Sequence, residues 1–541
     1  MKPRLIGVRW TWLRRATQWV LLALFLWLFR HTENRGAPGV NAAANAIFRL
    51  DPLVAVSAML AVKELVLSLW PALITVTLTL LLGRFFCGWV CPLGTLLDLT
   101  HRVLPRRRTA PNPRWRVAKF FLLGVVLVSA VAGFQLIGWL NPFSILVRGL
   151  TVAVDPALTW TLTAPFTWLL RHAPESVTNI SEPIYAWLKV HVLAFSQTRF
   201  QWAWVSLGIL LLVFALELVE RRCWCRNLCP SGALLGWLGR FSWLRRLPGR
   251  VCGGCKAESD CGEDCRMGAF DSEKRFLSES CNLCMDCVVR CPSGAAQFRF
   301  KPAMKPAAPF EPSRRLFLVS LATGIAVPVA ARASGAAHRM PSDLIRPPGA
   351  RPEKEFLEAC VRCGECMKVC VTNALQPVLF ETGLSGTFSP RLVPRMGYCE
   401  YNCTLCSQVC PTGAIQRLPL AQKQKFVMGR AIFNKEICLP YAKGESCITC
   451  EEHCPLPEKA IQFREVETVR KATGERVVVK QPFTLLKLCI GCGLCVNKCP
   501  VEGTAGVKVV RADAVPLAVR KEYEQLEASI APSPKGVTDP Y

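Results

Sequence analysis

The sequence predicts a helical membrane domain joined to two small cysteine-rich α+β domains, one on each side of a bilayer. The chain has 541 residues, enough for three or four domains. All 16 tryptophans lie between Trp10 and Trp243, among long apolar segments, and tryptophan gathers at membrane–water interfaces. Most of the 29 cysteines lie beyond residue 250, in regularly spaced groups. The fold class is therefore a membrane α-helical bundle of four spans and a fifth signal or anchor helix, with ferredoxin-like α+β domains on both sides.

Residues 1–245 form the predicted membrane domain. Four apolar segments could cross a bilayer, near residues 16–30, 65–86, 117–140 and 200–219. A spanning helix needs about 20 apolar residues, so the first segment is short unless its helix begins earlier. The segments between them, near 31–64 and 141–199, are expected to be loops of mixed charge.

The orientation of this domain follows from its positive charge. The chain carries a formal charge of +27, with arginines gathered at the N-terminus, after the second apolar segment and after the fourth. Basic residues stay on the cytoplasmic side, so both ends of the domain are predicted to be cytoplasmic. No nucleic-acid-binding motif accompanies the charge, which excludes a nucleic-acid partner as its explanation.

Two cysteine groups share the spacing C-x3-C-P at the ends of the second and fourth segments. They read FFCGWVCPLG and RRCWCRNLCPSG. Their four thiols, Cys87, Cys91, Cys225 and Cys229, are predicted to converge on one additional cluster or redox centre. The alternative is that these Cys-Pro turns only end helices, with the thiols as small apolar filler. Cys223 has no counterpart and receives no role.

Residues 246–303 form a predicted two-cluster domain. Its eight cysteines form two motifs, C-x2-C-x5-C-x3-C and C-x2-C-x2-C-x3-C, and they are Cys252, Cys255, Cys261, Cys265, Cys281, Cys284, Cys287 and Cys291. In ferredoxin motifs three thiolates hold one cluster and the fourth holds its neighbour. Cys291 should therefore complete the first group of three, and Cys265 should join Cys281, Cys284 and Cys287.

Residues 304–345 form a proline-rich linker followed by Ser313, Arg314 and Arg315 and an apolar run of 16 residues. This pattern is typical of a twin-arginine export signal. The alternative is a fifth ordinary span. Both interpretations leave the arginines inside and place the following residues in the periplasm.

Residues 346–515 contain four further motifs and are predicted to be a four-cluster periplasmic domain. Their sixteen cysteines are Cys360, Cys363, Cys366, Cys370, Cys399, Cys403, Cys406, Cys410, Cys438, Cys447, Cys450, Cys454, Cys489, Cys492, Cys495 and Cys499. Each motif ends in C-x2-C-x3-C, which favours six 4Fe-4S clusters in the chain over zinc or disulfides. The linkers allow the first motif to pair with the second or with the fourth. A hairpin about Thr473-Gly474 and a helix in the tail, residues 516–541, are also expected.

These motifs carry a resemblance over nearly the whole chain. Residues 1 to about 300 resemble NapH and MauN, the membrane ferredoxin-type proteins, and residues 313 to about 515 resemble their exported partners NapG and MauM. RCGECMKVC, YNCTLCSQVCPTGAI and CGLCVNKCP carry the second likeness. The resemblance implies a multi-pass protein of the bacterial inner membrane that acts as a quinol dehydrogenase and passes electrons to a periplasmic redox partner, a nitrate-reductase-type system or similar. Its departure from the family is that one chain holds both parts.

The function predicted from the residues is electron transfer through the membrane. No haem-attachment motif, dinucleotide fingerprint or phosphate-binding loop occurs. Quinol, the expected substrate, should bind within residues 1–245, and the long loop from Asn141 to Phe200, which is rich in Trp, Phe and Leu, should form part of its site. The alternative function is an iron–sulfur factor that matures or reactivates a periplasmic metalloenzyme.

Overall fold

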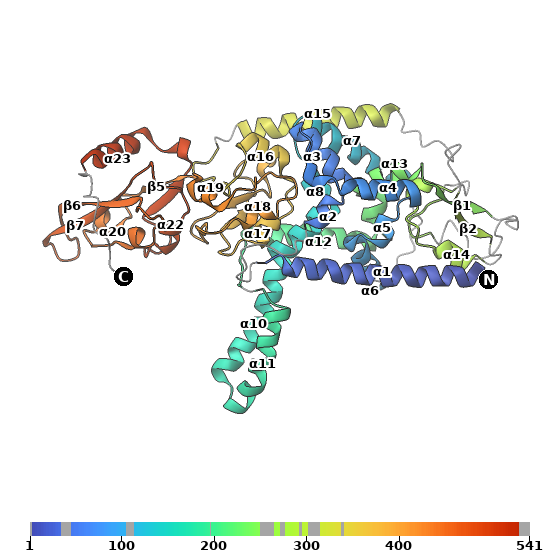
Figure 1. The fold of residues 1–541 in the computed structure, drawn as a ribbon, viewed down its shortest axis with the longest axis horizontal. Coiled ribbons are helices and arrows are strands. Elements are labelled where there is room, and N and C mark those ends of the chain that lie inside the picture. The colour runs from blue at the N-terminus through green and yellow to red at the C-terminus, as the bar shows by residue number, and fades with distance from the viewer. Residues whose placement is uncertain are drawn as a thin grey trace.

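The computed structural model describes residues 3–33, 45–103, 113–194, 196–248, 265–270, 276–291, 295–300, 314–336 and 340–529. A bundle of helices, the helical domain (residues 1–245), occupies the centre of the molecule (Figure 1). The small cysteine domain (residues 246–303) lies at one end of the bundle and the large cysteine domain (residues 346–515) at the other. The two cysteine-rich domains are thus separated by the length of the bundle.

The helical domain contains these helices of four or more residues: α1 (Pro3–His31), α2 (Ala46–Arg49), α3 (Pro52–Val62), α4 (Ala72–Leu82), α5 (Phe86–Trp89), α6 (Pro92–Val103), α7 (Ala118–Val131), α8 (Ile137–Leu140), α9 (Pro142–Gly149), α10 (Asp155–His172), α11 (Glu175–His191), α12 (Ala203–Ala215) and α13 (Pro230–Gly239). Single π-helical turns occur at Leu150–Val154 and Trp224–Leu228. Two polar residues followed by proline start buried helices: the Asp51 carboxylate accepts from Leu53 N before α3, and the Asn141 side chain accepts from Phe143 N and Ser144 N before α9.

The predicted apolar segments all fall on helices, with different bounds. The first lies inside α1, which begins at Pro3 and so has 29 residues. The third is interrupted between α7 and α8. Among the described residues, two helices are long and apolar enough to cross a membrane by length and composition, Pro142–His172 and Arg314–Ala333, and Leu67–Leu82 and Ala203–Leu218 are shorter apolar helices.

The expectation of loops near 31–64 and 141–199 was wrong. The first segment contains α3, of which Leu53, Val54 and Ala58 are fully buried in the core, whereas Val56 and Leu60 are exposed. The second contains α9, α10 and α11, and the latter two form a hairpin that projects from the body, crosswise to α1 (Figure 1). The starts of α3 and α9 follow from a capping residue with proline at the first helical position. In α10 and α11, side chains of mixed charge did not prevent helix formation.

Helix α15 (Arg314–Ala336) begins at the twin arginines and packs along α7. The contact is made by small residues: Ser129 Oγ donates to the Gly324 carbonyl at 3.1 Å, and a Cβ on Gly324 would lie 2.6 Å from Val128 Cβ. Close approach through small residues is how helices associate in membranes. Helices α1 and α15 lie on opposite sides of the bundle and both run from the small cysteine domain toward the large one (Figure 1).

The cysteine domains are built from short helices and two-stranded antiparallel sheets. In the small domain, β1 (Leu244–Pro248) pairs with β2 (Ala296–Phe300), beside α14 (Asp286–Arg290). In the large domain, β3 (Leu375–Pro377) pairs with β4 (Pro390–Leu392), β5 (Arg430–Phe433) with β8 (Val507–Val510), and β6 (Ile461–Val469) with β7 (Arg476–Thr484). Its helices of four or more residues are α16 (Glu353–Ala359), α17 (Glu365–Lys368), α18 (Leu405–Gln408), α19 (Leu420–Lys425), α20 (Leu439–Ala442), α21 (Thr449–Glu452) and α22 (Leu494–Lys498), with α23 (Leu517–Ser529) following. The predicted hairpin and the helix in the tail are confirmed as β6–β7 and α23.

Candidate metal centres

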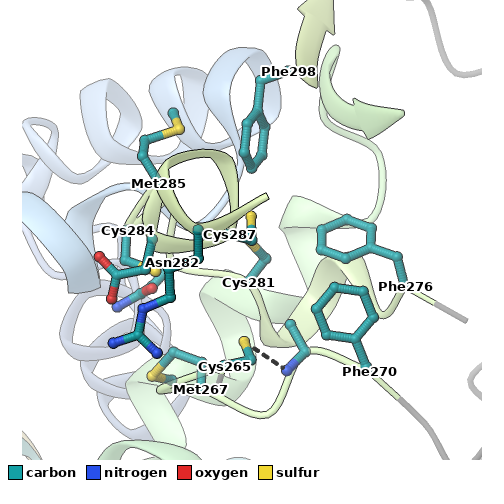
Figure 2. Close-up of a pocket in the computed structure, with 13 residues that line it drawn as sticks. Cys265, Met267, Phe270, Phe276, Cys281, Asn282, Cys284, Met285, Cys287 and Phe298 are labelled. Carbon is teal, nitrogen blue, oxygen red and sulfur yellow. Dashed lines mark hydrogen bonds between the residues drawn. The ribbon is translucent and has the colours of Figure 1, made fainter. Parts of the chain in front are cut away.

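Four thiols of the small cysteine domain line one cavity (Figure 2). They are Cys265, Cys281, Cys284 and Cys287, the set expected from the ferredoxin spacing. The loop can bring three of them together because Leu283 and Met285 adopt left-handed backbone conformations, with φ of 55° and 63°. Cys252, Cys255 and Cys261 lie outside the described residues, so the second predicted group is represented by the buried Cys291 alone.

Burial makes these thiols unfavourable places for charge unless a cation is near. It raises the pKa of Cys284 to about 11, and the Arg266 guanidinium opposes this. The same guanidinium donates to Asp286, which starts α14, and to the Asp98 carboxylate of α6 at 3.1 Å. Arg266 therefore joins the cavity to the helical domain.

The two C-x3-C-P groups adopt the same local structure. In each, the second cysteine precedes a helix with proline at its first position, and its sulfur accepts a backbone N–H three residues on: Gly94 N to Cys91 Sγ at 3.5 Å and Gly232 N to Cys229 Sγ at 3.3 Å. A thiolate is stabilised at a helix N-terminus. The turn interpretation and the metal interpretation are therefore compatible, because the same sulfur can cap a helix and face a metal.

The four thiols of these groups lie together at the meeting point of α5, α6 and α13. Burial raises the pKa of Cys225 to about 11, with Cys87 adding to the rise and Arg222 and Arg84 opposing it. Cys91 and Cys229 also interact electrostatically with both Cys225 and Cys87. The fifth thiol of the region, Cys223, accepts instead from Asn227 Nδ2 at 3.6 Å and lies near Glu220.

Two buried arginines enclose this group and were not singled out from the sequence. Arg84 and Arg222 are 1 % and 0 % exposed. Arg84 Nε donates to Cys87 Sγ at 3.3 Å and its terminal nitrogen to the Cys225 carbonyl at 3.1 Å, and Arg222 donates to the carbonyls of Cys87 and Gly94. Fixed cations of this kind offset the charge of thiolates or of an anionic cluster. Adjacency to the cysteines in "GRFFC" and "RRC" was the signal that could have revealed them.

The small cysteine domain rests directly on the C-x3-C-P groups. Trp89 Nε1 donates to the Leu283 carbonyl at 3.1 Å. A Cβ on Gly88 would lie 2.1 Å from the Asn282 oxygen, and one on Gly236 would lie 2.4 Å from the Glu279 oxygen. Only glycine permits this approach, which brings the loop that carries Cys281 and Cys284 against α5 and α13.

In the large cysteine domain, the first motif pairs with the second. Cys360, Cys363 and Cys366 interact electrostatically with Cys410, and Cys399, Cys403 and Cys406 with Cys370. Each set contains three thiols of one motif and the last thiol of the other. This settles the pairing that the linker lengths left open.

The third and fourth motifs pair in the same way. Cys454 lines a cavity with Cys489, Cys492 and Cys495, and Cys450 reaches the same cavity from the neighbouring group. Cys499 interacts with Cys438 and Cys450, beside Cys447. The two pairs touch where Cys399 N donates to the Cys492 carbonyl at 2.8 Å. The four groups of thiols therefore form a series, with the Cys360 group at one end and the Cys438 group at the other.

The Cys360 end of this series is docked on the helical domain. Ser144 Oγ of α9 donates to the Val361 carbonyl at 3.0 Å, and Arg148 donates to the Arg362 carbonyl at 3.1 Å while its guanidinium lies 4.0 Å from the Phe388 ring centre. Arg148 is 1 % exposed and lies near Cys363 and Cys360. A buried cation thus stands beside this group of thiols too.

The donor sets fit iron–sulfur clusters better than single ions. Within the part of the chain that the structure describes, no three His, Cys, Asp or Glu side chains are close enough to share one metal ion. A tetrahedral zinc would draw its thiolates to about 2.3 Å from one centre. Three thiols of one motif and one of another, spread around a cavity, are instead the donor set of a 4Fe-4S cluster.

Comparison with known proteins supports this chemistry. A model described as "4Fe-4S dicluster domain" matches residues 359–414, and one described as "4Fe-4S binding domain" matches residues 65–111, 201–250 and 406–426. The second model thus includes both C-x3-C-P groups.

Curated relatives include the methylamine utilization ferredoxin-type protein MauM of Methylorubrum extorquens, 36% identical over 216 residues, which are 38% of this chain and 91% of the relative. The chain belongs to the MauM/NapG family of ferredoxin-type proteins. MauM of Paracoccus denitrificans is 38% identical over 31% of this chain and 72% of its own length, and the ferredoxin-type protein NapG of Escherichia coli is 34% identical over 33% and 73%. No solved structure matches. As in other ferredoxin-type proteins, the chemistry of this MauM/NapG member is iron–sulfur electron transfer.

Proposed function

We propose that this chain is a membrane-bound conduit that oxidises quinol and passes the electrons to a periplasmic redox partner. The observation that carries the proposal is the order of the thiol groups. The small-domain cavity lies against the C-x3-C-P thiols, and at the other end of the helical domain the Cys360 group begins a series of four. Clusters bound at these positions supply one-electron carriers.

The membrane arrangement is part of the proposal. A NapH/MauN-like membrane part, residues 1–245, is fused to the exported part, and α15 joins the two sides. The placement of the cysteine domains at opposite ends of the bundle, with α1 and α15 running the same way between them, supports it (Figure 1). Arginine at the start of α15 supports a cytoplasmic small domain and a periplasmic large domain.

The residues of the chain contribute positioning and charge. Arg84, Arg222 and Arg148 place buried guanidinium groups beside thiols, so an added electron there meets a cation instead of bare apolar surroundings. Burial keeps water from the groups, and the protein sets cluster potentials through charge, hydrogen bonds and exposure.

The test uses the full chain, purified without oxygen in detergent. Addition of a short-chain quinol should bleach the visible absorption of the clusters within a single mixing experiment, and a soluble periplasmic acceptor should restore it over many cycles. Clusters that dithionite reduces but quinol does not would rule out quinol oxidation. Reduction of a partner once per chain, without turnover, would favour the maturation or reactivation role.

A further inference from the structure

We infer that the quinol binds in the apolar cavity between the helical domain and the small cysteine domain; this rests on the proposed function. The cavity has a volume of about 580 Å³, within the range of small-molecule sites. Its walls come from α1, the end of α4, α5, α14 and the β1–β2 sheet. The sequence instead indicated the segment from Asn141 to Phe200, which lies at the opposite end of the helical domain beside the large cysteine domain.

The lining of the cavity suits an aromatic ring with an apolar tail. Five aromatic side chains contribute: Trp10, Phe85, Trp89, Phe298 and Phe300. Trp10 and Trp89 meet edge to face with ring centres 6.3 Å apart, and a flat ring can add to such a pair. Polar side chains are few, Gln297 and Arg299. Arg299 Nε and one terminal nitrogen donate to Gln297 Oε1 at 3.1 and 2.7 Å, and the remaining N–H groups of this pair are donors from which a quinone oxygen can accept.

The wall of the cavity is also the wall of a thiol group. Leu283, Met285 and Val288 line it, and they alternate along the chain with Cys281, Cys284 and Cys287. Met285 and Phe298 line both this cavity and the cavity that the four thiols share. An occupant would therefore lie one side-chain layer from a cluster bound there, where a redox-active ring could exchange electrons with it and a lipid acyl chain could not.

The cavity also lies where an amphipathic carrier can arrive from the bilayer. Leu82 and Phe85 stand at the end of the second apolar segment, and Trp10 is 46 % exposed. Each quinol oxidised to quinone gives up two electrons and two protons. The electrons pass singly to the neighbouring cluster and on to the oxidised periplasmic partner, and the protons pass to water at the mouth of the cavity.

The first test maps the site directly. A photoreactive azidoquinone, added to the full chain and illuminated, should label peptides that contain residues 283–300 and Trp89, and an excess of decylubiquinone should suppress the label. Label confined to residues 141–200 would overturn the inference. So would a photoreactive phospholipid that labels the cavity and is not displaced by decylubiquinone.

The second test fills the cavity. Leu244→Trp and, on another wall, Leu82→Trp should each weaken decylubiquinone binding, read from tryptophan quenching, on the order of tenfold or more. Quinol-driven cluster reduction should slow in parallel, while dithionite still reduces every cluster. Leu211→Trp, on the exposed face of α12, is the matched control and should bind as the unaltered chain does.

The two proposals fail in different ways. Unchanged binding and unchanged reduction in both cavity variants would overturn the site and leave quinol oxidation standing. An unaltered chain whose clusters accept no electrons from quinol would overturn the proposed function itself.

Discussion

Three arginines from different parts of the chain meet at Asp98. Its carboxylate lies 2.8 Å from Arg222, 3.1 Å from Arg266 and 3.6 Å from Arg14. Asp98 belongs to α6. Arg222 follows α12, Arg266 lies in the small cysteine domain and Arg14 lies in α1. One carboxylate, whose side chain is only 12 % exposed, therefore holds the C-x3-C-P region and the small domain together.

We expect Asp98→Asn to loosen the small domain. The change leaves three guanidinium groups close together without their shared anion, and removing one partner of a buried ion pair costs about 3–5 kcal/mol. Limited proteolysis should cut the small domain faster, while the large domain is cut as before. Arg511 and Asp513, an exposed pair, supply the control: Asp513→Asn should change little.

The same site predicts a dependence on pH. Burial raises the pKa of Asp98, but Arg222, Arg266 and Arg14 outweigh it, so the pKa lies well below the ordinary carboxyl value. Its contribution to stability is complete above the ordinary value, near 4, and is lost as pH falls toward the lowered one. The unaltered chain should lose more stability than Asp98→Asn between pH 5 and pH 2, in unfolding by denaturant. Parallel losses would show that Asp98 does not carry this dependence.

The C-x3-C-P thiols give the third prediction at the scale of residues. Cys91→Ala with Cys229→Ala should remove the centre at this position or slow quinol-driven reduction of the large-domain clusters, because these sulfurs belong to the group of four thiols on which the small cysteine domain rests. Iron analysis and stopped-flow absorption measure both effects. Cys223→Ala is the control, since this buried thiol lies apart from the four. Full iron and unchanged rates in the double variant would leave the cysteines as helix caps only.

At the scale of elements, the packing of α15 on α7 depends on Gly324. A Cβ at this position would lie 2.6 Å from Val128 Cβ, so Gly324→Ala must push the helices apart, at a typical cost of about 1–3 kcal/mol. Gly208 of α12 has no atom within 4 Å of such a Cβ, so Gly208→Ala should be neutral or slightly stabilising through helix propensity. Thermal unfolding in detergent compares the two. Equal midpoints would mean that α15 is not held by this contact.

The sequence predicted elements wherever a local rule decided the structure. Ferredoxin spacing predicted that Cys265 would join Cys281, Cys284 and Cys287. The last three lie within seven residues of one loop, and the fourth ligand of such a group is the last cysteine of the other motif. The hairpin about Gly474 followed from alternating residues and a turn, and Gly474 has a φ of 74°. Pairing of the large-domain motifs could not be predicted, because linkers of similar length permit either partner.

Long-range packing decided the rest. Arg222 counts as topological charge in the sequence, and Arg84 and Arg148 stand alone within apolar stretches. All three are nevertheless buried beside thiols, since only the fold brings their partners near. The apolar cavity is built from α1, α4, α5 and β2. Its first and last lining residues, Trp10 and Phe300, are 290 positions apart in the sequence. No local pattern reports such a meeting.

For the whole molecule, the metal content measures how many of the cysteine groups are filled. Six ferredoxin clusters require about 24 iron atoms per chain, at four per cluster, and a further cluster at the C-x3-C-P thiols would raise this to about 28. Removal of iron by a chelator under oxidation should loosen the large domain, because thiols of all four groups lie in its apolar core or pack against it. Stoichiometric zinc with little iron would contradict the assignment.

The topology of the whole chain is tested by reporters at two positions that lie outside the described residues, Arg250 and Tyr541. A reporter after Arg250 should behave as cytoplasmic and one after Tyr541 as periplasmic, because the arginines before Arg250 and at the start of α15 stay inside. Replacing Arg314 and Arg315 by lysine keeps the charge and removes the twin-arginine signature. If export of the large domain uses that signature, the second reporter should become cytoplasmic in this variant. If α15 is an ordinary fifth span, lysine should serve as well as arginine, and the reporter in the variant should stay periplasmic. A cytoplasmic Tyr541 reporter in the unaltered chain would instead mean that α15 lies along the bundle without crossing the bilayer.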